Sequence, residues 1–473
     1  MPAKTKYIKH IKVKQIDGAW CKVSPQDRRH FEDVLSYNYT WYKKTKYKNE
    51  PRHETGFMID RRRNEFLLGL LPIIKQHLRK KNIGIKVTKS ELAKSVETFK
   101  PTAKPFLNGI TFRPDQIELI EKAIRRKRGI IKSPTGSGKT IIAMGISSMF
   151  PPEAKILFLV HTKDLLSQTV DEFRSHGFKN VQMIGGGGDK AINPDTRIVV
   201  ATNLKYVRLV KADRDLDTYF SLVIVDEAHH ASDIKNSYGT ILMLNWAPYK
   251  IGFTATPHSK QNDAYKQLSS AALIGPVIGE LTIEEGIELG IIARPKLTLL
   301  PVPHERHIGD LYSYKDIYPA GITNNKTRNK LIISTIAKRN RNSKSVLIMV
   351  KEIQQGENLV DIAENMGVPV TFLQGSTSAI VRNKVKRLFS EKMIGAVITT
   401  VIWKEGINIP SLDCVINACG GRGEIQTLQF TGRGLRRTDL KHTVEVVDFL
   451  DPYKFLAQHT VMRLQTYARN GWL

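Results

Sequence analysis

Residues 129–140 read Gly-Ile-Ile-Lys-Ser-Pro-Thr-Gly-Ser-Gly-Lys-Thr, and this stretch decides the fold. An apolar strand runs into a glycine-rich loop, and a helical pattern follows at once. Gly136 and Gly138 would let backbone N–H groups face phosphate oxygens, helped by the positive end of the helix. Lys139 would reach the β and γ phosphates of ATP, and the Thr140 hydroxyl would bind Mg²⁺. The predicted nucleotide-binding residues of this loop are Ser133, Pro134, Thr135, Gly136, Ser137, Gly138, Lys139 and Thr140.

The loop departs from the commonest form of the motif in one place, because Ser133 stands where glycine is usual. A chance glycine and serine turn is the competing interpretation. The strand before the loop and the helix after it favour the phosphate-binding loop.

A second predicted strand, residues 222–225, ends in two acids, Asp226 and Glu227, within Asp-Glu-Ala-His. Parallel sheets place their ligands at the carboxyl ends of strands, so these carboxylates should face the loop. Asp226 would hold Mg²⁺ and Glu227 would orient the attacking water. Alone, the tetrapeptide could be a helix N-terminus stabilised by acids. Together with the loop, it predicts hydrolysis of a nucleoside triphosphate.

The charge balance predicts a polyanionic partner. The chain has 73 Lys+Arg and 45 Asp+Glu, which gives a formal net charge of +28. Residues 1–110 alone contain 25 Lys+Arg and 10 Asp+Glu. An excess of this size is typical of nucleic-acid binding. The rest of the composition is that of an ordinary globular protein, which excludes disordered and fibrous classes.

The cysteines and the hydropathy of the sequence indicate the cellular compartment in which the protein is expected. The cysteines Cys21, Cys414 and Cys419 lack Cys-x-x-Cys spacing, which argues against a disulfide framework or a structural zinc. No apolar run approaches the ~18 residues of a membrane span, and the first residues do not resemble a signal peptide. We expect a soluble, cytoplasmic protein without a membrane partner, in the host cytoplasm if it is phage-encoded.

The N-terminal region combines basic and aromatic residues. Residues 7–24 predict a hairpin around Asp17-Gly18, and Ser24 is a candidate N-cap for a helix that follows. Tyrosines and a tryptophan then alternate with lysines from 37 to 48, before an arginine triplet at 61–63. Lysines can bind phosphates while aromatic rings stack on bases, although the aromatics could instead form a small core beneath solvated lysines. The predicted nucleic-acid contacts are Trp41, Lys43, Lys44, Arg61 and Arg62.

From Phe112 onward the motifs resemble, in order, those of the superfamily 2 helicases and translocases. Residues 112–116 resemble the adenine-recognition element, which implies Gln116 as base reader with Arg113 beside it. Residues 159–168 and 200–203 resemble motifs Ia and Ib, which contact the nucleic-acid backbone in that family. Residues 254–257 resemble motif III, which links the ATP site to the strand path. The coupling residues that the resemblance implies are Thr162, Thr202, Thr254 and Thr256.

A second set of motifs follows. Residues 345–350 resemble motif IV, and residues 397–410 resemble motif V, where Asn408 replaces the more usual aspartate. Residues 429–436, Gln-Phe-Thr-Gly-Arg-Gly-Leu-Arg, match motif VI, whose two arginines face the γ-phosphate in that family. The implied residues are Gly406 and Asn408 for nucleotide binding, and Gln429, Arg433 and Arg436 for catalysis. Asp448 and Asp451 are expected to end the last strand and to support motif VI.

The resemblance implies an α/β fold with two tandem RecA-like parallel-sheet motor domains, preceded by a small α+β basic DNA-binding domain. We place the N-terminal domain at 1–100, a linker at 101–110, and the motor domains at 111–294 and 295–473. The likeness is closest to phage branch-migration helicases of the UvsW type, carried by residues 275–295, by residues 370–375 and by the N-terminal pattern.

This resemblance implies an ATP-dependent DNA helicase that remodels branched DNA in recombination, repair or replication, by junction migration, fork regression or R-loop unwinding. Its expected cofactors are ATP and Mg²⁺. Its expected partner is branched or forked duplex with single-stranded regions, while RNA in a hybrid and phage or host replication and recombination proteins stay open. The alternatives are a DEAH-type RNA helicase, a restriction-system motor subunit, and an ATP-switched nucleic-acid clamp or annealing protein without strand separation.

Two further features of the sequence are interpreted as structural rather than as ligand-binding sites. Residues 185–188 are four glycines, but no Lys-Thr and no helix follow, so a turn is favoured over a second phosphate loop. His229 and His230 lack metal-ligand spacing, which favours hydrogen bonding over zinc.

Overall fold

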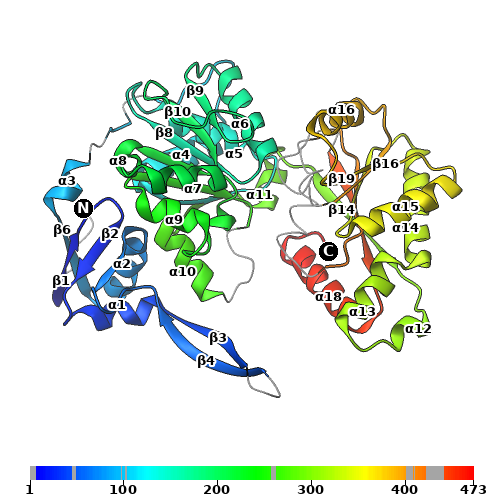
Figure 1. Ribbon diagram of the computed structural model, residues 1–473, viewed down its shortest axis with the longest axis horizontal. Helices are drawn as coiled ribbons and strands as arrows, with labels where there is room; N and C mark the ends of the chain where they lie inside the picture. The colour runs from blue at the N-terminus through cyan, green and yellow to red at the C-terminus, as the bar shows by residue number, and fades with distance from the viewer. Residues whose placement is uncertain are drawn as a thin grey trace. The chain divides into compact units, whose positions relative to one another are not determined.

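The computed structural model describes residues 7–44, 49–96, 99–101, 104–256, 263–400, 409, 411–421 and 442–473. The chain forms two compact units (Figure 1). Unit 1 comprises Met1–Ser133 and Lys139–Glu280, and unit 2 comprises Pro134–Gly138 and Leu281–Leu473. Each unit contains one large parallel sheet, and unit 1 also contains a small N-terminal α+β region, so the predicted fold class is confirmed.

The N-terminal region is a four-stranded sheet in the order β5-β2-β1-β6. Its strands are β1 (Lys9–Gln15), β2 (Trp20–Val23), β5 (Glu65–Leu67) and β6 (Ile83–Lys89), and its helices are α1 (Arg28–Leu35), α2 (Leu71–Lys80) and α3 (Glu91–Ser95), with a short 3-10 helix η1 (Leu68–Leu70). The predicted hairpin is confirmed: β1 and β2 are antiparallel, and Asp17 Oδ1 accepts hydrogen bonds of 2.7 Å from the Ala19 and Trp20 N–H groups in the turn.

The first helix begins later than predicted. Ser24 does not cap it, because the Ser24 hydroxyl accepts from Asp27 N–H at 3.3 Å in a separate turn. Helix α1 starts at Arg28, with Asp27 as its N-cap residue. A serine and an aspartate three residues apart can stabilise a turn as well as a helix end, which explains the error.

The aromatic and basic stretch forms a two-stranded antiparallel arm. Its strands are β3 (Ser36–Lys44) and β4 (Asn49–Phe57), and Figure 1 shows the arm extending from the N-terminal sheet. Residues 38–41 of the arm are exposed, whereas Tyr37 at its base is half-buried and packs on Tyr265 with ring centroids 5.0 Å apart.

The large sheet of unit 1 has seven parallel strands in the order β13-β7-β12-β11-β8-β10-β9. Both faces are covered by helices, and its central strands are wholly buried, as parallel sheets require. The strands are β7 (Arg128–Lys132), β8 (Ile156–Val160), β9 (Val181–Ile184), β10 (Ile198–Thr202), β11 (Leu222–Val225), β12 (Tyr249–Thr254) and β13 (Val277–Glu280). The helices are α4 (Pro114–Arg126), α5 (Lys139–Ser148), α6 (Lys163–Ser175), α7 (Asn203–Ala212), α8 (Leu216–Tyr219), η2 (Ala228–Ala231), α9 (Ser237–Leu244) and α10 (Ala264–Leu273).

The N-terminal region shares one hydrophobic core with this sheet. Ile11 and Phe31 belong to the same buried cluster as Val223 and Leu242. The buried Arg128 donates from Nη2 to Gly18 O at 2.6 Å and to Ala247 O at 2.9 Å, which ties the hairpin turn to the first residue of β7. The N-terminal region is therefore packed against the seven-stranded sheet rather than tethered to it.

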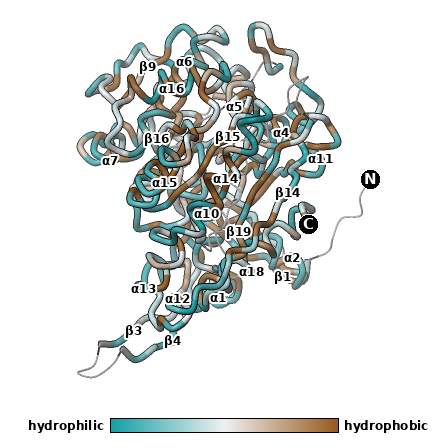
Figure 2. Tube along the Cα trace, turned by 90° about the vertical axis from the view of Figure 1, so that its right-hand side faces the viewer, coloured by the Kyte–Doolittle hydropathy of each residue, from teal (hydrophilic) through white to brown (hydrophobic). Residues whose placement is uncertain are grey.

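Unit 2 is a six-stranded parallel sheet in the order β14-β19-β18-β15-β17-β16. Figure 2 shows β14, β15 and β19 among the hydrophobic parts of the trace. The strands are β14 (Arg294–Pro301), β15 (Val346–Met349), β16 (Thr371–Leu373), β17 (Ala396–Thr399), β18 (Cys414–Asn417) and β19 (Thr443–Leu450). The helices are α11 (Ile283–Glu288), α12 (Arg306–Gly309), α13 (Tyr314–Tyr318), η3 (Pro319–Thr323), α14 (Lys326–Asn340), α15 (Ile353–Asn365), α16 (Ala379–Ser390) and α18 (Lys454–Arg469).

Within the described residues, no helix has both the length and the apolar character needed to cross a lipid bilayer.

Candidate nucleotide site and nucleic-acid surface

The phosphate loop connects the carboxyl end of β7 to helix α5. Gly136 and Gly138 have φ values of 88° and 93°, which glycine adopts without strain. The Ser137 hydroxyl donates to Pro134 O at 2.8 Å and closes the loop on itself. Ser133 N–H donates to Thr254 O at 2.9 Å, which fixes the start of the loop against the end of β12. The local backbone therefore has the conformation that a phosphate cradle needs.

Lys139 and Thr140 are the first two residues of α5. The Lys139 ammonium donates to Ser133 O at 3.3 Å, so the side chain folds back over the loop. Both residues start a helix whose N–H groups and dipole favour an anion at this end. The order of the strands, with β12 between β7 and β11, brings them to the same sheet edge as Asp226 and Glu227.

The two acids follow β11 in a constrained turn. Asp226 N–H donates to Leu159 O at 3.0 Å, and Asp226 Oδ1 accepts from Glu227 N–H at 2.9 Å. Glu227 has a left-handed backbone, φ 47° and ψ 54°, and is 8% exposed. A non-glycine residue held in this region costs about 1–3 kcal/mol and persists only where the surroundings enforce it. The turn therefore fixes where the Glu227 carboxylate points.

A buried network joins Glu227 to the end of β12. His229 Nδ1 lies 3.2 Å from Glu227 Oε2 and 3.1 Å from Thr254 Oγ1. Thr254 Oγ1 in turn accepts from Thr256 N–H at 3.2 Å. Both threonines are buried. They therefore sit behind the surface, in contact with the predicted catalytic acid through His229.

One residue of this site was missed by sequence reasoning. His161, directly after β8, stacks on His230 with ring centroids 3.8 Å apart. The sequence signal that could have identified His161 is its position directly after a strand, within the residues that resemble motif Ia. Within the described residues, no group of three or more His, Cys, Asp or Glu side chains gathers to hold a metal ion.

The predicted adenine-recognition residues form a helix cap. Gln116 is buried, and its Oε1 accepts from Arg113 N–H at 3.2 Å at the start of α4. The Arg113 guanidinium binds Asp115 at 3.0 and 2.9 Å. These contacts fix both side chains, and their role toward adenine stays a prediction.

Thr162 and Thr202 stand immediately before α6 and α7. The Thr162 hydroxyl caps α6 by accepting from Leu165 N–H at 3.2 Å. Thr202 is buried beside Gly185, which lies in the predicted turn after β9. Both threonines are at the carboxyl edge of the sheet, and their contact with a nucleic-acid backbone stays a prediction.

The arm presents aromatic rings on one face. Tyr39 and Trp41 are each 41% exposed, two residues apart on β3. Arg52 pairs with Trp41 across the ribbon, and Glu54 pairs with Tyr39, whose hydroxyl donates to the carboxylate at 2.8 Å. The part of the arm that contains these two residue pairs is therefore aromatic and nearly balanced in charge. Lys43 is exposed near the end of β3, and Lys44 is the last residue of that strand.

Two of the predicted arginines flank the base of the arm. The Arg61 guanidinium lies 4.9 Å from the Phe57 ring centroid and bonds Glu32 at 2.9 Å. Arg62 is exposed beside it. The remaining predicted site residues lie outside the described residues: Gly406, Asn408, Gln429, Arg433 and Arg436.

Two family models match the chain in the expected order. Residues 109–259 match the res subunit of type III restriction enzymes, and residues 327–438 match the helicase conserved C-terminal domain. Together these matches span more than half of the chain. With the two parallel-sheet units and the motif order, they show that the chain belongs to the superfamily 2 helicases, which are ATP-dependent nucleic-acid motors.

Particular relatives sharpen this assignment. The chain is 25% identical over 382 residues to the ATP-dependent DNA helicase uvsW of Enterobacteria phage T4, covering 75% of this chain and 74% of that protein. It is 26% identical over 368 residues to the DNA 3'-5' translocase XPB2 of Sulfurisphaera tokodaii, and the match covers 70% of this chain and 80% of that protein. Among solved structures, the type ISP restriction-modification enzyme LlaBIII bound to DNA matches with a TM-score of 0.58 at 17% identity, over 82% of this chain and 32% of that chain. The structural likeness shows the shared fold.

Proposed function

We propose that this chain is an ATP-dependent DNA helicase or translocase that remodels branched DNA. The relatives that are named as a DNA helicase and a DNA translocase support DNA as the nucleic acid along which this chain moves. The observation that carries the branched-DNA assignment is the aromatic arm of β3 and β4, built on a region that shares a hydrophobic core with the nucleotide lobe.

The nucleotide lobe supplies the residues for hydrolysis. The loop N–H groups and Lys139 bind the phosphates, and Thr140 and Asp226 offer a hydroxyl and a carboxylate oxygen. Mg²⁺ prefers such oxygen ligands together with substrate phosphates and waters, so this donor set fits it. When bound, the ion neutralises charge on the transferred phosphoryl group. Glu227, fixed by its left-handed turn, orients and polarises the attacking water.

The buried network offers a route from hydrolysis to movement. Glu227 contacts His229, and His229 contacts Thr254, whose hydroxyl fixes Thr256. A change in the charge near Glu227 therefore acts on the backbone just after β12. We propose that this link couples the state of the nucleotide to the grip on DNA.

The N-terminal region selects the substrate. Tyr39 and Trp41 can stack on bases exposed where strands part, because aromatic faces accept any base. Arg62 and Lys43 can bind phosphates near the two ends of the arm. Because the region shares its core with the lobe that contains the phosphate loop, we expect the arm to move together with that lobe.

The test measures ATP hydrolysis and strand separation on a four-way junction, a fork, a linear duplex and an RNA duplex. We expect DNA-stimulated hydrolysis with preference for the junction and the fork, and no activity in Lys139→Ala. Hydrolysis without strand displacement would favour the clamp, and preference for RNA would favour the RNA helicase.

The arm is tested by Trp41→Ala, with Tyr312→Ala as control because Tyr312 is an 86% exposed aromatic of unit 2. Loss of a base stack is worth about 1–3 kcal/mol, so we expect roughly 5- to 150-fold weaker junction binding with unchanged basal hydrolysis. Equal junction affinity of Trp41→Ala and the wild type would refute the role of the arm.

A further inference from the structure

Unit 1 contains a cavity at the edge of the seven-stranded sheet opposite the phosphate loop. Its volume is about 560 Å³, within the range of small-molecule sites. Its lining comes from residues 104–108, from the ends of α5 and α6, and from the segments before β8, β9 and β10. The phosphate loop instead follows the carboxyl end of β7. Strands β8 and β10 have five residues each, so the two edges lie about 15 Å apart and can hold ligands at once.

The cavity is basic. Among the described residues that line it, three carry cationic side chains, Lys104, Lys179 and Arg197, and one carries a carboxylate, Asp195. Both lysines are exposed to solvent at the rim. His176 adds an imidazole, whose Nδ1 lies 2.8 Å from Glu172 O at the end of α6. Cations gathered in a concave surface attract anions such as phosphate groups, and we call this site the basic cavity.

Arg197 has more donors than its structural role uses. Its Nη2 donates to Ser147 O at 3.3 Å and to Phe150 O at 2.7 Å, so it caps the end of α5. Its Nε is buried and has no hydrogen-bond partner among the described residues. Burial lowers the pKa of Arg197 below its ordinary value, and the charge of Glu153 opposes this effect. An anion in the basic cavity would therefore stabilise a guanidinium that is already partly desolvated.

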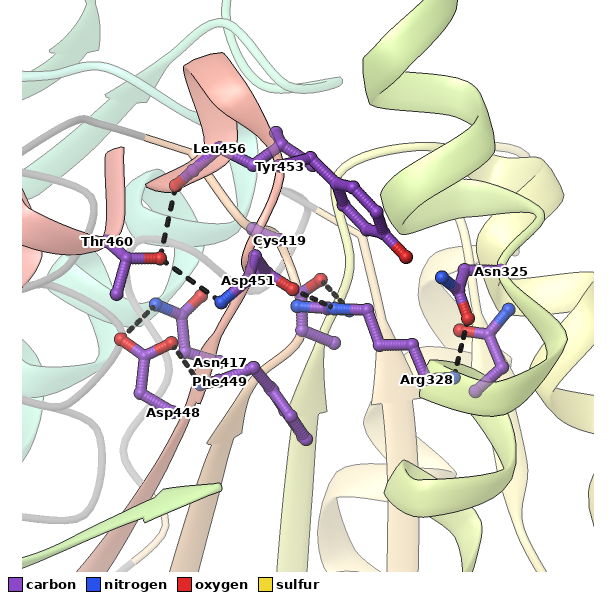
Figure 3. A network of polar contacts seen from close by, with 12 residues as sticks. Asn325, Arg328, Asn417, Cys419, Asp448, Phe449, Asp451, Tyr453, Leu456 and Thr460 are labelled. Carbon is purple, nitrogen blue, oxygen red and sulfur yellow. Dashed lines mark hydrogen bonds and ion pairs between the residues drawn. The ribbon is translucent and has the colours of Figure 1, made fainter. Parts of the chain in front are cut away.

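An arginine buried in unit 2 shows the contrast. Arg328 Nε donates to Asp451 Oδ1 at 2.8 Å, and Figure 3 shows this carboxylate beside the guanidinium. The charge of Arg328 is thus balanced from within the chain. Arg197 instead binds carbonyl oxygens, and no ion pair joins it to a carboxylate in the described ranges. A ligand can supply the counter-charge that Arg197 lacks.

Phe106 places an aromatic ring beside these cations. Its side chain is 69% exposed, while the next residue, Leu107, is buried in the core. The Phe106 N–H donates to Ser148 Oγ at 3.0 Å, so the backbone that carries the ring is anchored. A single exposed apolar residue is common on protein surfaces. Beside a basic cavity, however, an anchored and exposed ring is a platform on which a base can stack.

We propose that the basic cavity binds a nucleoside phosphate, either free or as one unit of a single DNA strand. The phosphate lies against the cations Lys104, Lys179 and Arg197, and the base stacks on Phe106. An acidic peptide would also satisfy the cations, but it would leave the exposed ring without a planar partner. The site is separate from the phosphate loop, so the proposal does not depend on ATP hydrolysis.

The test is light-induced cross-linking of the full chain to 5-iodo-deoxyuridine monophosphate and to a tetranucleotide that contains the same base. Saturating ADP and Mg²⁺ are present, so the phosphate loop is already occupied. Peptide mapping then locates the label. We expect saturable label on peptides that contain residues 104–108 or 176–180, and ADP should not reduce it. Label that falls only on other peptides would overturn the proposal.

Variants of Phe106 test the stacking of the base. Phe106→Leu keeps an apolar side chain but removes the ring, so the half-saturating concentration for labelling should rise roughly 5- to 150-fold. Phe106→Trp restores a ring and should label like the wild type. Because the Phe106 side chain is exposed, both variants should fold and keep basal ATP hydrolysis. Equal labelling of Phe106→Leu and the wild type would refute the site.

A matched pair of lysines tests the phosphate contact. Lys179→Gln should raise the half-saturating concentration by up to about fivefold, as expected for an exposed charge pair. Lys190→Gln is the control, because Lys190 is exposed nearby in the chain but does not line the basic cavity. It should leave labelling unchanged, and equal effects of the two substitutions would contradict a phosphate contact at Lys179.

The two probes also distinguish the source of the ligand. A mononucleotide that labels as tightly as the tetranucleotide points to a free nucleotide, whereas tighter labelling by the tetranucleotide points to a DNA strand. A tetraglutamate peptide tests the alternative occupant. If the peptide binds the cavity and neither nucleotide probe labels it, the site is one for acidic peptides and the proposal is wrong.

Discussion

The close packing of the N-terminal region against the first large sheet predicts that Gly69→Ala destabilises both together. Gly69 is a buried residue of η1 and does not have a left-handed backbone, so only contacts oppose a side chain there. An added Cβ would lie 2.5 Å from Ala272 O and closer still to Ala271 O, both at the end of α10. Neither obstacle is a flexible side chain. Helix α10 and η1 must therefore separate.

The close approach of the added Cβ to α10 determines how much stability Gly69→Ala should lose. Restoring an acceptable distance requires a backbone shift of roughly 0.8 Å or more in a close-packed core. Overpacking of this kind costs about 1–3 kcal/mol, and backbone obstacles place Gly69→Ala near the upper end. At roughly 2–4 °C per kcal/mol for a unit of this size, Tm should fall by about 6–12 °C.

The assay is thermal unfolding followed by circular dichroism, with limited proteolysis at intermediate temperatures. Gly309→Ala is the control, because its added Cβ would meet only the far end of the His304 side chain, at 2.8 Å. We expect the N-terminal region and the seven-stranded sheet to become protease-sensitive together. An unchanged Tm, or an N-terminal region that unfolds while the sheet keeps its wild-type transition, would refute the shared core.

Two further predictions concern the site, and one concerns the buried thiols. Thr254→Val removes the hydroxyl that joins His229 to Thr256, so strand separation per ATP should fall at least tenfold while hydrolysis persists. Thr335→Val, a buried control in α14, should leave that ratio unchanged, and unchanged coupling in Thr254→Val would contradict the proposed link. Burial raises the pKa of the thiols of Cys21, Cys414 and Cys419 to about 12. Below pH 9 these thiols should therefore resist alkylation in the native protein and react only after unfolding. Glu227→Gln should bind ATP normally in a nucleotide-binding titration yet hydrolyse it at least about 100-fold more slowly, and weakened ATP binding would show that Glu227 serves binding rather than water activation.

The sequence was most informative where local chemistry determines local structure. The strand predicted at 222–225 is β11, because four consecutive apolar residues fit a strand buried on both faces. The loop at 133–140 and the Asp17-Gly18 turn follow from the backbone freedom of glycine and the bonding of aspartate.

Features that depend on distant contacts were not predictable. The aromatic residues of 37–44 gave no sign that Glu54 and Arg52, whose charges offset each other, would lie opposite Tyr39 and Trp41. The packing of Gly69 against α10 joins residues about 200 positions apart, and no local pattern encodes it. The contact between Thr254 and His229 likewise joins the end of β12 to the residues after β11, 25 positions away in the chain.

The central claim is that DNA drives ATP hydrolysis at the site built around Glu227. The most direct measurement is the steady-state ATPase rate with and without a four-way DNA junction, for the wild type and Glu227→Gln. We predict that the junction raises the wild-type rate at least tenfold and that Glu227→Gln is inactive in both conditions. A wild-type rate that does not respond to DNA, or a Glu227→Gln variant that hydrolyses ATP like the wild type, would contradict it.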